Sequence, residues 1–292
     1  MEWKVEESGK TVGALLKERG VSTTLVRRLK RTPSGITLDG EHVTVRRVAE
    51  KGQILKIEEK DLTASENVLP RPGALDTVFE DGYLLIVNKP FGMPVHPSRG
   101  HFEDTLANIV AGYFQSRGEA RVFRAVNRLD SGTGGLMCIA KDAYCAEMLS
   151  ADLAGKKIRR VYEAVLCGLI TQDEGVIDKP IGRLPGFGIK RGVVQGGEKA
   201  VTRFKVTARG KTHTRAEIEL LTGRTHQIRV HFSDMGHPVW GDFMYGKEED
   251  FRGLALFSKR LELTHPVTKE KLAFELPLPG FFDEIDDFVS EK

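Results

Sequence analysis

The sequence predicts an α+β fold in which a mixed, mostly antiparallel sheet forms a large domain and a small α/β domain precedes it. Three observations lead to this prediction. Strand-like apolar segments mostly follow one another directly, with few helical segments between them. A polar stretch at 61–75 contains Pro70, Pro72 and Gly73, which is the composition of a linker. The 292 residues, 40% of them hydrophobic, are enough for two domains that each bury a core.

Charge and composition exclude several classes of protein. The 44 basic and 41 acidic side chains give a formal net charge of +3, which is too small to indicate nucleic-acid binding by itself. The basic excess lies in residues 1–60, whereas residues 283–292 form an acidic tail. The ordinary globular composition excludes a mostly disordered chain. No apolar run approaches the roughly 18 residues of a membrane-spanning helix, so we expect no membrane association.

The cysteines and the N-terminus indicate the compartment. The three cysteines, Cys138, Cys145 and Cys167, are odd in number and lack the C-x-x-C spacing of zinc or redox sites. They predict reduced thiols, which are typical of cytoplasmic proteins. The N-terminal residues are charged and lack the apolar segment of a signal peptide. We therefore expect a cytoplasmic protein.

The predicted small domain, residues 1–60, begins with two short helices. Val12, Leu15 and Leu16 form the apolar side of the first helix, which Gly20 ends. Ser22 is the expected cap of the second. This second helix and the residues that follow it are strongly basic, with Arg27, Arg28, Lys30 and Arg31. Short strand-like segments come next, and Asp39-Gly40 between two of them is typical of a hairpin turn.

The predicted large domain, residues 76–282, contains more strands than helices. Apolar residues at helical spacing predict helices at 104–118 and 142–154. The segments with strand character are 83–88, 135–140, 160–167, 200–207, 214–221, 226–233, 261–264 and 272–276. Because most of these strands have no helix between them, antiparallel pairing is favoured over a doubly wound sheet.

The first segment that suggests chemistry, residues 127–135, combines charge with glycine. An arginine and an aspartate flank one leucine, just before a glycine-rich turn. In an extended segment, Arg128 and Asp130 share one face while Leu129 points into the core. The glycines would allow another backbone to approach closely. A surface Arg–Asp pair beside a turn is the simpler interpretation, and spacing alone leaves it open.

A second segment, residues 222–231, ends in an alternating pattern. Ile228, Val230 and Phe232 predict the inner face of a strand, which leaves Arg229 and His231 on the outer face. On that strand Arg229 would be able to neutralise a buried carboxylate and lower its pKa. His226 and His231 would face opposite sides, so we expect no metal site there. An ordinary solvated strand face remains the alternative.

The third segment is an apolar strand that carries Tyr162. Its ring would be able to stack on a flat ligand such as a nucleobase, although a buried core tyrosine is the commoner explanation. The motifs of several other enzyme classes are missing from the sequence. We find no Walker-type loop, no dinucleotide G-x-G-x-x-G opening a helix, and no G-x-S-x-G elbow.

Taken as an ordered set, these segments resemble the RluA family of RNA pseudouridine synthases, and in particular its RluD-like members. The resemblance covers about residues 76–280. The matching segments are 88–97, the Arg-Leu-Asp triplet at 128–130, 162–168, 180–183, 200–202, 223–231, 236–246 and 264–266. Residues 1–60 resemble, more loosely, the RNA-binding module first seen in ribosomal small-subunit protein four (S4).

The resemblance implies the pseudouridine synthase fold and an isomerase that converts uridine in RNA to pseudouridine after flipping the nucleotide out of its stack. By this analogy Asp130 is the essential carboxylate and Arg229 its cationic partner. Tyr162 would pack on the base, and Arg128 would fill the space that the flipped nucleotide leaves. Asp130 would attack the ribose, attack the base or assist loss of a ribose proton. The reaction requires no cofactor and no metal.

The resemblance also implies RNA as the partner. Large-subunit ribosomal RNA is the expected substrate, with transfer RNA as the alternative, and we expect a monomer. Phosphate contacts would make binding sensitive to salt. The expected RNA-binding side chains are Arg27, Arg28, Lys30, Arg31, Lys190 and Arg191.

The sequence departs from the family pattern at three places. Asn127 stands where the family usually has His, Gly134 stands where it usually has Ser, and Phe257-Ser258 replaces a frequent His-Ala pair. These departures bear on substrate choice more than on chemistry. Two rival functions remain open at this point. One is a non-catalytic RNA-binding or ribosome-assembly protein on the same fold, and the other is a nucleoside hydrolase that uses Asp130 with a second carboxylate.

Overall fold

The computed structural model describes residues 1–58, 68–246 and 253–285. Residues 61–67 of the expected linker at 61–75 and residues 286–292 of the expected acidic tail at 283–292 therefore lie outside the described residues. Within these ranges no helix is both long and apolar enough to cross a membrane.

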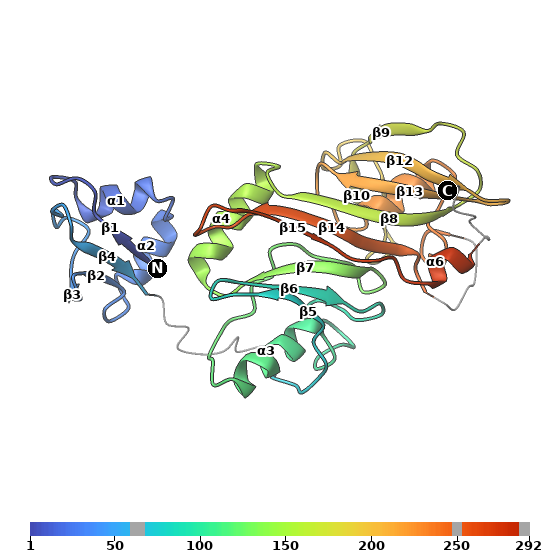
Figure 1. Cartoon of the computed structure of the whole chain (residues 1–292). Helices are drawn as coiled ribbons and strands as arrows, with labels where there is room; N and C mark the ends of the chain where they lie inside the picture. The colour runs from blue at the N-terminus through green and yellow to red at the C-terminus, as the bar shows by residue number, and fades with distance from the viewer. Residues whose placement is uncertain (59–67, 247–252, 286–292) are drawn as a thin grey trace.

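The N-terminal part forms an antiparallel sheet covered by two short helices (Figure 1). The helices are α1 (Val12–Glu18) and α2 (Thr23–Leu29), and the Ser22 hydroxyl caps α2 as predicted. The strands, in the order β1-β4-β2-β3, are β1 (Glu2–Lys4), β4 (Ile54–Ile57), β2 (Ile36–Leu38) and β3 (Glu41–His42). Asp39 and Gly40 join β2 to β3 with φ angles of 51° and 85°. Such a pair of left-handed residues is typical of a type I′ turn, so the predicted hairpin is confirmed.

The large part is built on a mixed sheet, which counts nine strands among the described residues. Its order is β5-β6-β7-β14-β8-β13-β12-β9, and β15 pairs with β14. β14 runs parallel to β7, and the other pairs are antiparallel, as predicted. The strands are β5 (Thr77–Glu80), β6 (Leu84–Lys89), β7 (Gly134–Ala140), β8 (Arg159–Cys167), β9 (Glu174–Asp178), β12 (Val201–Arg209), β13 (His213–Leu220), β14 (Leu256–Thr264) and β15 (Lys271–Glu275).

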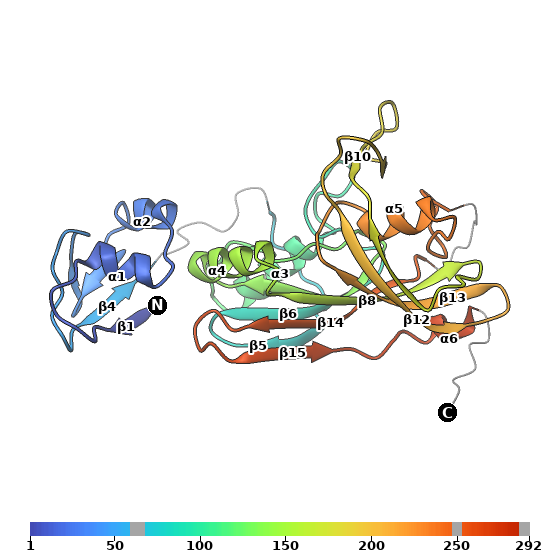
Figure 2. The ribbon, with the colours of Figure 1, turned by 90° about the horizontal axis from the view of Figure 1, so that it is seen from above.

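Helices and one hairpin complete the large part. The helices are α3 (Leu106–Ser116), α4 (Ala143–Ala154), α5 (Gln227–Asp234) and α6 (Phe281–Glu284). Strands β10 (Ile181–Arg183) and β11 (Arg191–Val193) form the hairpin. Figure 2 shows that α4, α5 and this hairpin project from the same side of strands β6, β14 and β15. α3 and α4 confirm the two helices predicted at 104–118 and 142–154.

The N-terminal part of the chain packs against helix α4 of the large part. Its Tyr144 hydroxyl donates a hydrogen bond to the Arg19 carbonyl at 2.9 Å. The Trp3 ring meets the Tyr144 ring edge to face, with centroids 5.6 Å apart. Leu16 and Leu25 belong to the same buried cluster as Cys145. The N-terminal sheet is therefore packed against α4, and the same helix reaches the site described below with its C-terminal end.

One predicted element was wrong. A strand was predicted at 226–233, but Gln227–Asp234 form helix α5. The alternation of apolar and polar residues wrongly indicated a strand with one exposed face, because residues 227–232 are all buried, the polar ones included. Ile228 and Phe232 are four residues apart and share one helical face, where they join the main core, whereas Val230 packs in a separate small cluster. The short strands β1, β5, β9, β10 and β11 were not predicted from the sequence.

Candidate active site

The centre of the site is a buried guanidinium between two aspartates. Nη1 of Arg229, on α5, lies 3.1 Å from Oδ2 of Asp130. Its Nε and Nη2 donate to the two carboxylate oxygens of Asp242, at 2.7 and 2.8 Å. Asp242 is 1% exposed and also accepts the backbone N–H groups of Met244 and Tyr245. Asp242 therefore fixes Arg229, and Arg229 fixes Asp130.

The arrangement keeps Arg229 charged. Burial lowers the pKa of this guanidinium, but the hydrogen bond and charge of Asp242, helped by Asp130, raise it above its ordinary value. This permanent cation pairs with the Asp130 carboxylate at 3.1 Å. This is the partner that the sequence led us to expect for Asp130, although it comes from a helix where a strand was expected.

Tyr162 and Leu129 form the apolar wall beside Asp130. Tyr162 lies on β8, 3% exposed, and lines the same cleft as Asp130. Burial raises the pKa of its phenol, so the hydroxyl is protonated at neutral pH. Leu129 is buried in the core, as alternation along the segment predicted, while Arg128 and Asp130 both border the cleft. A flat, apolar surface thus lies next to a carboxylate that is paired with Arg229.

His226 and Tyr245 form a hydrogen-bonded pair next to Asp130. The Tyr245 hydroxyl accepts the backbone N–H of Arg191 at 2.9 Å, and it lies 2.8 Å from Nδ1 of His226. Its own proton is therefore available to His226 Nδ1. Burial lowers the pKa of His226, which favours the neutral ring with its proton on Nε2. That atom lies 3.9 Å from Oδ2 of Asp130.

Lys89 hydrogen-bonds to two loops beside the site, the one that follows β6 and the one that contains Ser131. Its side chain is 1% exposed, and Nζ donates to the carbonyls of Pro90, Met93 and Ser131 at 2.8, 2.7 and 3.1 Å. Burial lowers the pKa of Lys89 to about 8, partly offset by the charge of Asp130. Because Ser131 follows Asp130 directly, this ammonium helps to set the position of the aspartate.

The cleft in front of these residues has a volume of about 730 Å³. It runs from Asp130 and Tyr162 to the C-terminal end of α4, where Leu153 and Ala154 line it. The ionisable side chains on its walls are mainly basic: Arg128, Lys156, Arg160 and Arg224. With Asp130 already paired, the cleft is suited to an anionic polymer with a flat base.

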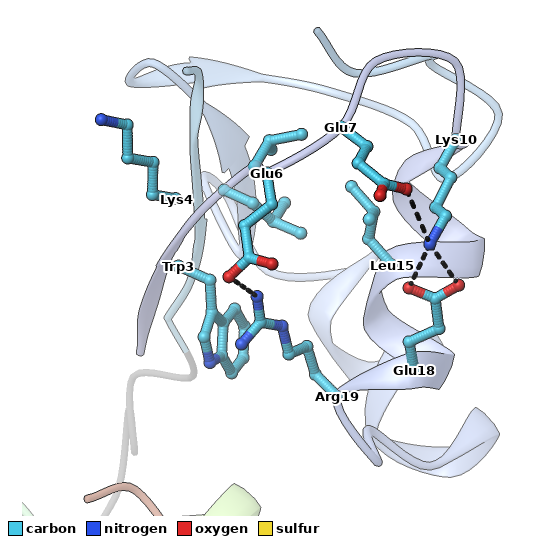
Figure 3. Close-up of a pocket in the computed structure, with 10 residues that line it drawn as sticks. Trp3, Lys4, Glu6, Glu7, Lys10, Leu15, Glu18 and Arg19 are labelled. Carbon is cyan, nitrogen blue, oxygen red and sulfur yellow. Dashed lines mark hydrogen bonds and ion pairs between the residues drawn. The ribbon is translucent and has the colours of Figure 1, made fainter. Parts of the chain in front are cut away.

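A smaller cavity of about 130 Å³ in the N-terminal part is a poorer candidate (Figure 3). Its Lys10 lies between Glu7 and Glu18, at 3.8 and 3.0 Å. Its Arg19 faces Glu6 at 4.0 Å. These exposed basic groups are neutralised by neighbouring carboxylates, so the cavity has no strong attraction for a phosphate.

The expected RNA-binding residues fall into two groups. Lys190 and Arg191 lie at the β10–β11 hairpin, close to the site, since the Lys190 ammonium is 5.4 Å from the centre of the Tyr245 ring. The second group lies on and after α2, and its members are exposed: Arg27, Arg28, Lys30 and Arg31. This second group belongs to the N-terminal part, which packs against α4.

Three residues of the site were assigned no role from the sequence. Asp242, Tyr245 and Lys89 lie within the motif segments, but nothing in their spacing says that they meet Arg229, His226 or the Asp130 loop. Asn127, one of the departures, is 3% exposed and holds its segment against β7, since its side chain accepts the Cys138 N–H at 2.8 Å. Among the described residues no group of three metal-ligating side chains could hold an ion.

Comparisons with known proteins agree on one family. Residues 83–234 match the family described as RNA pseudouridylate synthase. An uncharacterized RNA pseudouridine synthase of Bacillus subtilis, YjbO, is 38% identical over 270 residues, which are 92% of this chain and 95% of that protein. The ribosomal large subunit pseudouridine synthase D of Pseudomonas aeruginosa is 36% identical over 262 residues, covering 85% of this chain and 81% of that protein.

A solved structure gives the same result. Human RNA pseudouridylate synthase domain containing 1 superposes with a TM-score of 0.61 at 26% identity. The match covers 74% of this chain and 89% of the human one. The predicted fold class, a mixed and mostly antiparallel sheet of the pseudouridine synthase type, is confirmed.

Proposed function

This chain belongs to the RNA pseudouridylate synthase family, and on that premise we propose that it converts specific uridines of large-subunit ribosomal RNA to pseudouridine, with Asp130 as the essential carboxylate. The observation that carries the proposal is the 3.1 Å pair of Asp130 and Arg229 beside the buried Tyr162 ring. The reaction needs a carboxylate held by a cation next to a flat apolar surface, and both features line this cleft.

The proposed reaction moves the uracil without adding or removing atoms overall. The bond between N1 and the ribose C1′ breaks, and a bond from carbon 5 to C1′ forms. Carbon 5 loses its proton, and N1 gains one. Asp130 acts as the ionised carboxylate, by attack on the ribose, attack on the base or removal of a ribose proton. Tyr162 packs on the base and assists loss of the carbon 5 proton.

The target nucleotide must leave its stack to reach Asp130. Flipping costs a few kcal/mol, and a side chain that fills the vacated space offsets part of this cost. Arg128 is exposed at the border of the cleft, two residues before Asp130. We assign it this filling role.

Ribosomal RNA is proposed as the substrate because several relatives, including the Pseudomonas aeruginosa and Pasteurella multocida proteins, are named ribosomal large subunit pseudouridine synthase D. Residues 1–60 are proposed as an S4-like RNA-binding domain and residues 76–282 as the catalytic domain, with the exposed basic residues of α2 and of the hairpin as phosphate contacts. A monomeric state and a cytoplasmic location complete the proposal.

The experiment that tests the proposal uses RNA labelled with tritium at carbon 5 of uridine. Separate pools of ribosomal and transfer RNA, prepared from cells that lack this gene, are incubated with the full chain. Release of tritium from the ribosomal pool, without release of free uracil, is the expected result. Release from transfer RNA alone would identify transfer RNA as the substrate in place of ribosomal RNA. Binding without any release would favour the non-catalytic alternative. Release of free uracil would identify a hydrolase.

A further inference from the structure

Arg160 carries a buried guanidinium without a carboxylate partner among the described residues. Its residue is 7% exposed. Nη2 reaches the Thr222 carbonyl only at 3.5 Å, and the buried Nε has no hydrogen-bond partner in the described part of the chain. Every other buried arginine or lysine that the site uses, such as Arg229 and Lys89, has close acceptors.

Arg160 lies close to Tyr162 on the same strand and in the same cleft. It lies on β8 two residues before Tyr162, so both side chains are on the same face of the sheet, with about 7 Å between their backbone positions. Both line the large cleft. Gly223 lies against the guanidinium, because a Cβ atom there would be 3.1 Å from Nη1. The absence of a side chain at Gly223 leaves this side of the guanidinium open.

A buried cation without an anion lowers the free energy of unfolding. This cost is offset when an anionic ligand binds next to the cation. The other ionisable groups on the cleft walls narrow the choice of ligand. Arg128, Lys156 and Arg224 are basic, and the only acidic group that lines this cleft within the described residues, Asp130, is already paired with Arg229. The missing group is therefore an anion supplied from the cleft.

We propose that Arg160 and the adjoining 222–224 loop form a subsite for a backbone phosphate of the RNA next to the flipped uridine. This inference rests on the proposed function, since it identifies how the same cleft holds its substrate. The planar guanidinium presents parallel N–H groups that fit two phosphate oxygens. The phosphate binds about 7 Å along β8 from the tyrosine that packs on the base. One contact therefore holds the RNA backbone and the other holds the base.

The first test measures binding of the full chain to a large-subunit ribosomal RNA transcript over a series of salt concentrations. Arg160→Met is expected to weaken binding between about ten- and a hundredfold, the value of a hydrogen-bonded charge. The slope of log affinity against log salt falls by about 0.7, as expected for one lost phosphate contact on a single strand. Arg160→Lys keeps the charge and retains most of the slope.

A matched control is Arg203→Met. Arg203 is exposed on β12 and pairs with Glu219 at 3.3 Å, outside the cleft. Its loss leaves affinity and slope unchanged.

The second test separates a phosphate subsite from a structural role. Without RNA, Arg160→Met melts at the same temperature as the wild type or above it, because an unpaired buried charge has been removed. A lower melting temperature together with unchanged affinity and slope overturns the inference. A wild-type chain that binds the transcript but releases no tritium overturns the proposed function alone, since the affinity and slope of Arg160→Met still test the subsite. A wild-type chain that does not bind the transcript overturns the subsite.

Discussion

Nη1 of Arg229 lies 3.1 Å from the Asp130 carboxylate, and the rest of the guanidinium is held by a buried aspartate. Because Asp242 takes both remaining hydrogen-bonding edges, the cation is in place before any substrate arrives. Asp130 and Arg229 are 99 residues apart in sequence. The fold therefore builds the central pair of the site from two distant segments and fixes one of them through a third.

Replacement of Asp242 by asparagine tests this dependence. The amide keeps the shape but removes the charge that pairs with Arg229, so a buried guanidinium loses its main partner. We expect a loss of about 3–5 kcal/mol in the free energy of unfolding, together with slower tritium release. Asp234→Asn is the control, because Asp234 forms a half-exposed pair with Lys179; such pairs contribute at most about 1 kcal/mol. Equal behaviour of the two variants would contradict the account.

Two replacements of Tyr162 separate stacking from proton transfer. Tyr162→Phe keeps the ring, so RNA affinity stays near that of the wild type. Loss of the hydroxyl is expected to slow tritium release by about a hundredfold, which is typical of a lost proton-transfer group. Tyr162→Ala loses the ring as well and weakens binding by about 1–3 kcal/mol per stacked base. Wild-type release by Tyr162→Phe would leave the ring with a stacking role only.

Lys89 gives the reaction an alkaline limit. Below pH 8 its ammonium can donate to three loop carbonyls, and above this pH it loses a proton and one donor. We therefore expect tritium release to fall as the pH rises through about 8. The pH profile of Lys89→Met, measured at the same points, should lie lower and show no such limb. An unchanged limb in this variant would assign it to another group.

The stability effect of Lys89 has the opposite sign. Its pKa in the folded chain, about 8, lies below the ordinary value of 10.5. Between these values the unfolded chain binds more protons, so the contribution of Lys89 to the free energy of unfolding rises with pH in this window. A fall in activity above pH 8 is therefore not explained by unfolding through this group, and thermal melts at pH 8 and 9 of wild type and Lys89→Met check the difference.

The exposed basic residues of α2 are expected to act on affinity alone. The double variant Arg27→Gln and Lys30→Gln should bind ribosomal RNA more weakly, with a shallower dependence of affinity on salt. The rate at saturating RNA should stay unchanged, because Asp130 is untouched. Lys56→Gln is the control, since Lys56 on β4 is paired with Glu58 at 3.1 Å. A salt dependence equal to that of the wild type would remove α2 from the RNA-binding surface.

The elements that the sequence predicted well have strong local signals. The cap at Ser22, the Asp39-Gly40 turn and helices α3 and α4 depend on residues a few positions apart, which the sequence displays directly. Helix α5 lacked such a signal. Its N-cap residue, His226, has a left-handed φ of 59° and makes no side-chain capping hydrogen bond. Residues 227–232 are all buried, so the helix has no exposed polar face there of the kind that marks most helices.

The site was predictable in part for the same reason. The motif segments indicated Asp130, Tyr162 and Arg229 together, and these three residues line one pocket. Their supports were not predictable. Asp242 reaches Arg229 around the end of α5, and Lys89 reaches Ser131 from 42 residues away. Such contacts depend on how strands pair in the folded sheet, which no spacing within a single sequence expresses.

The most direct test of the account compares the wild type with Asp130→Asn in two measurements on the same ribosomal RNA labelled at carbon 5. The account predicts that Asp130→Asn binds the RNA with wild-type affinity and releases no tritium, a loss of roughly 10⁴-fold or more. Circular dichroism of both proteins confirms that the variant is folded. Tritium release by Asp130→Asn at the wild-type rate would contradict the assignment of Asp130 as the essential carboxylate.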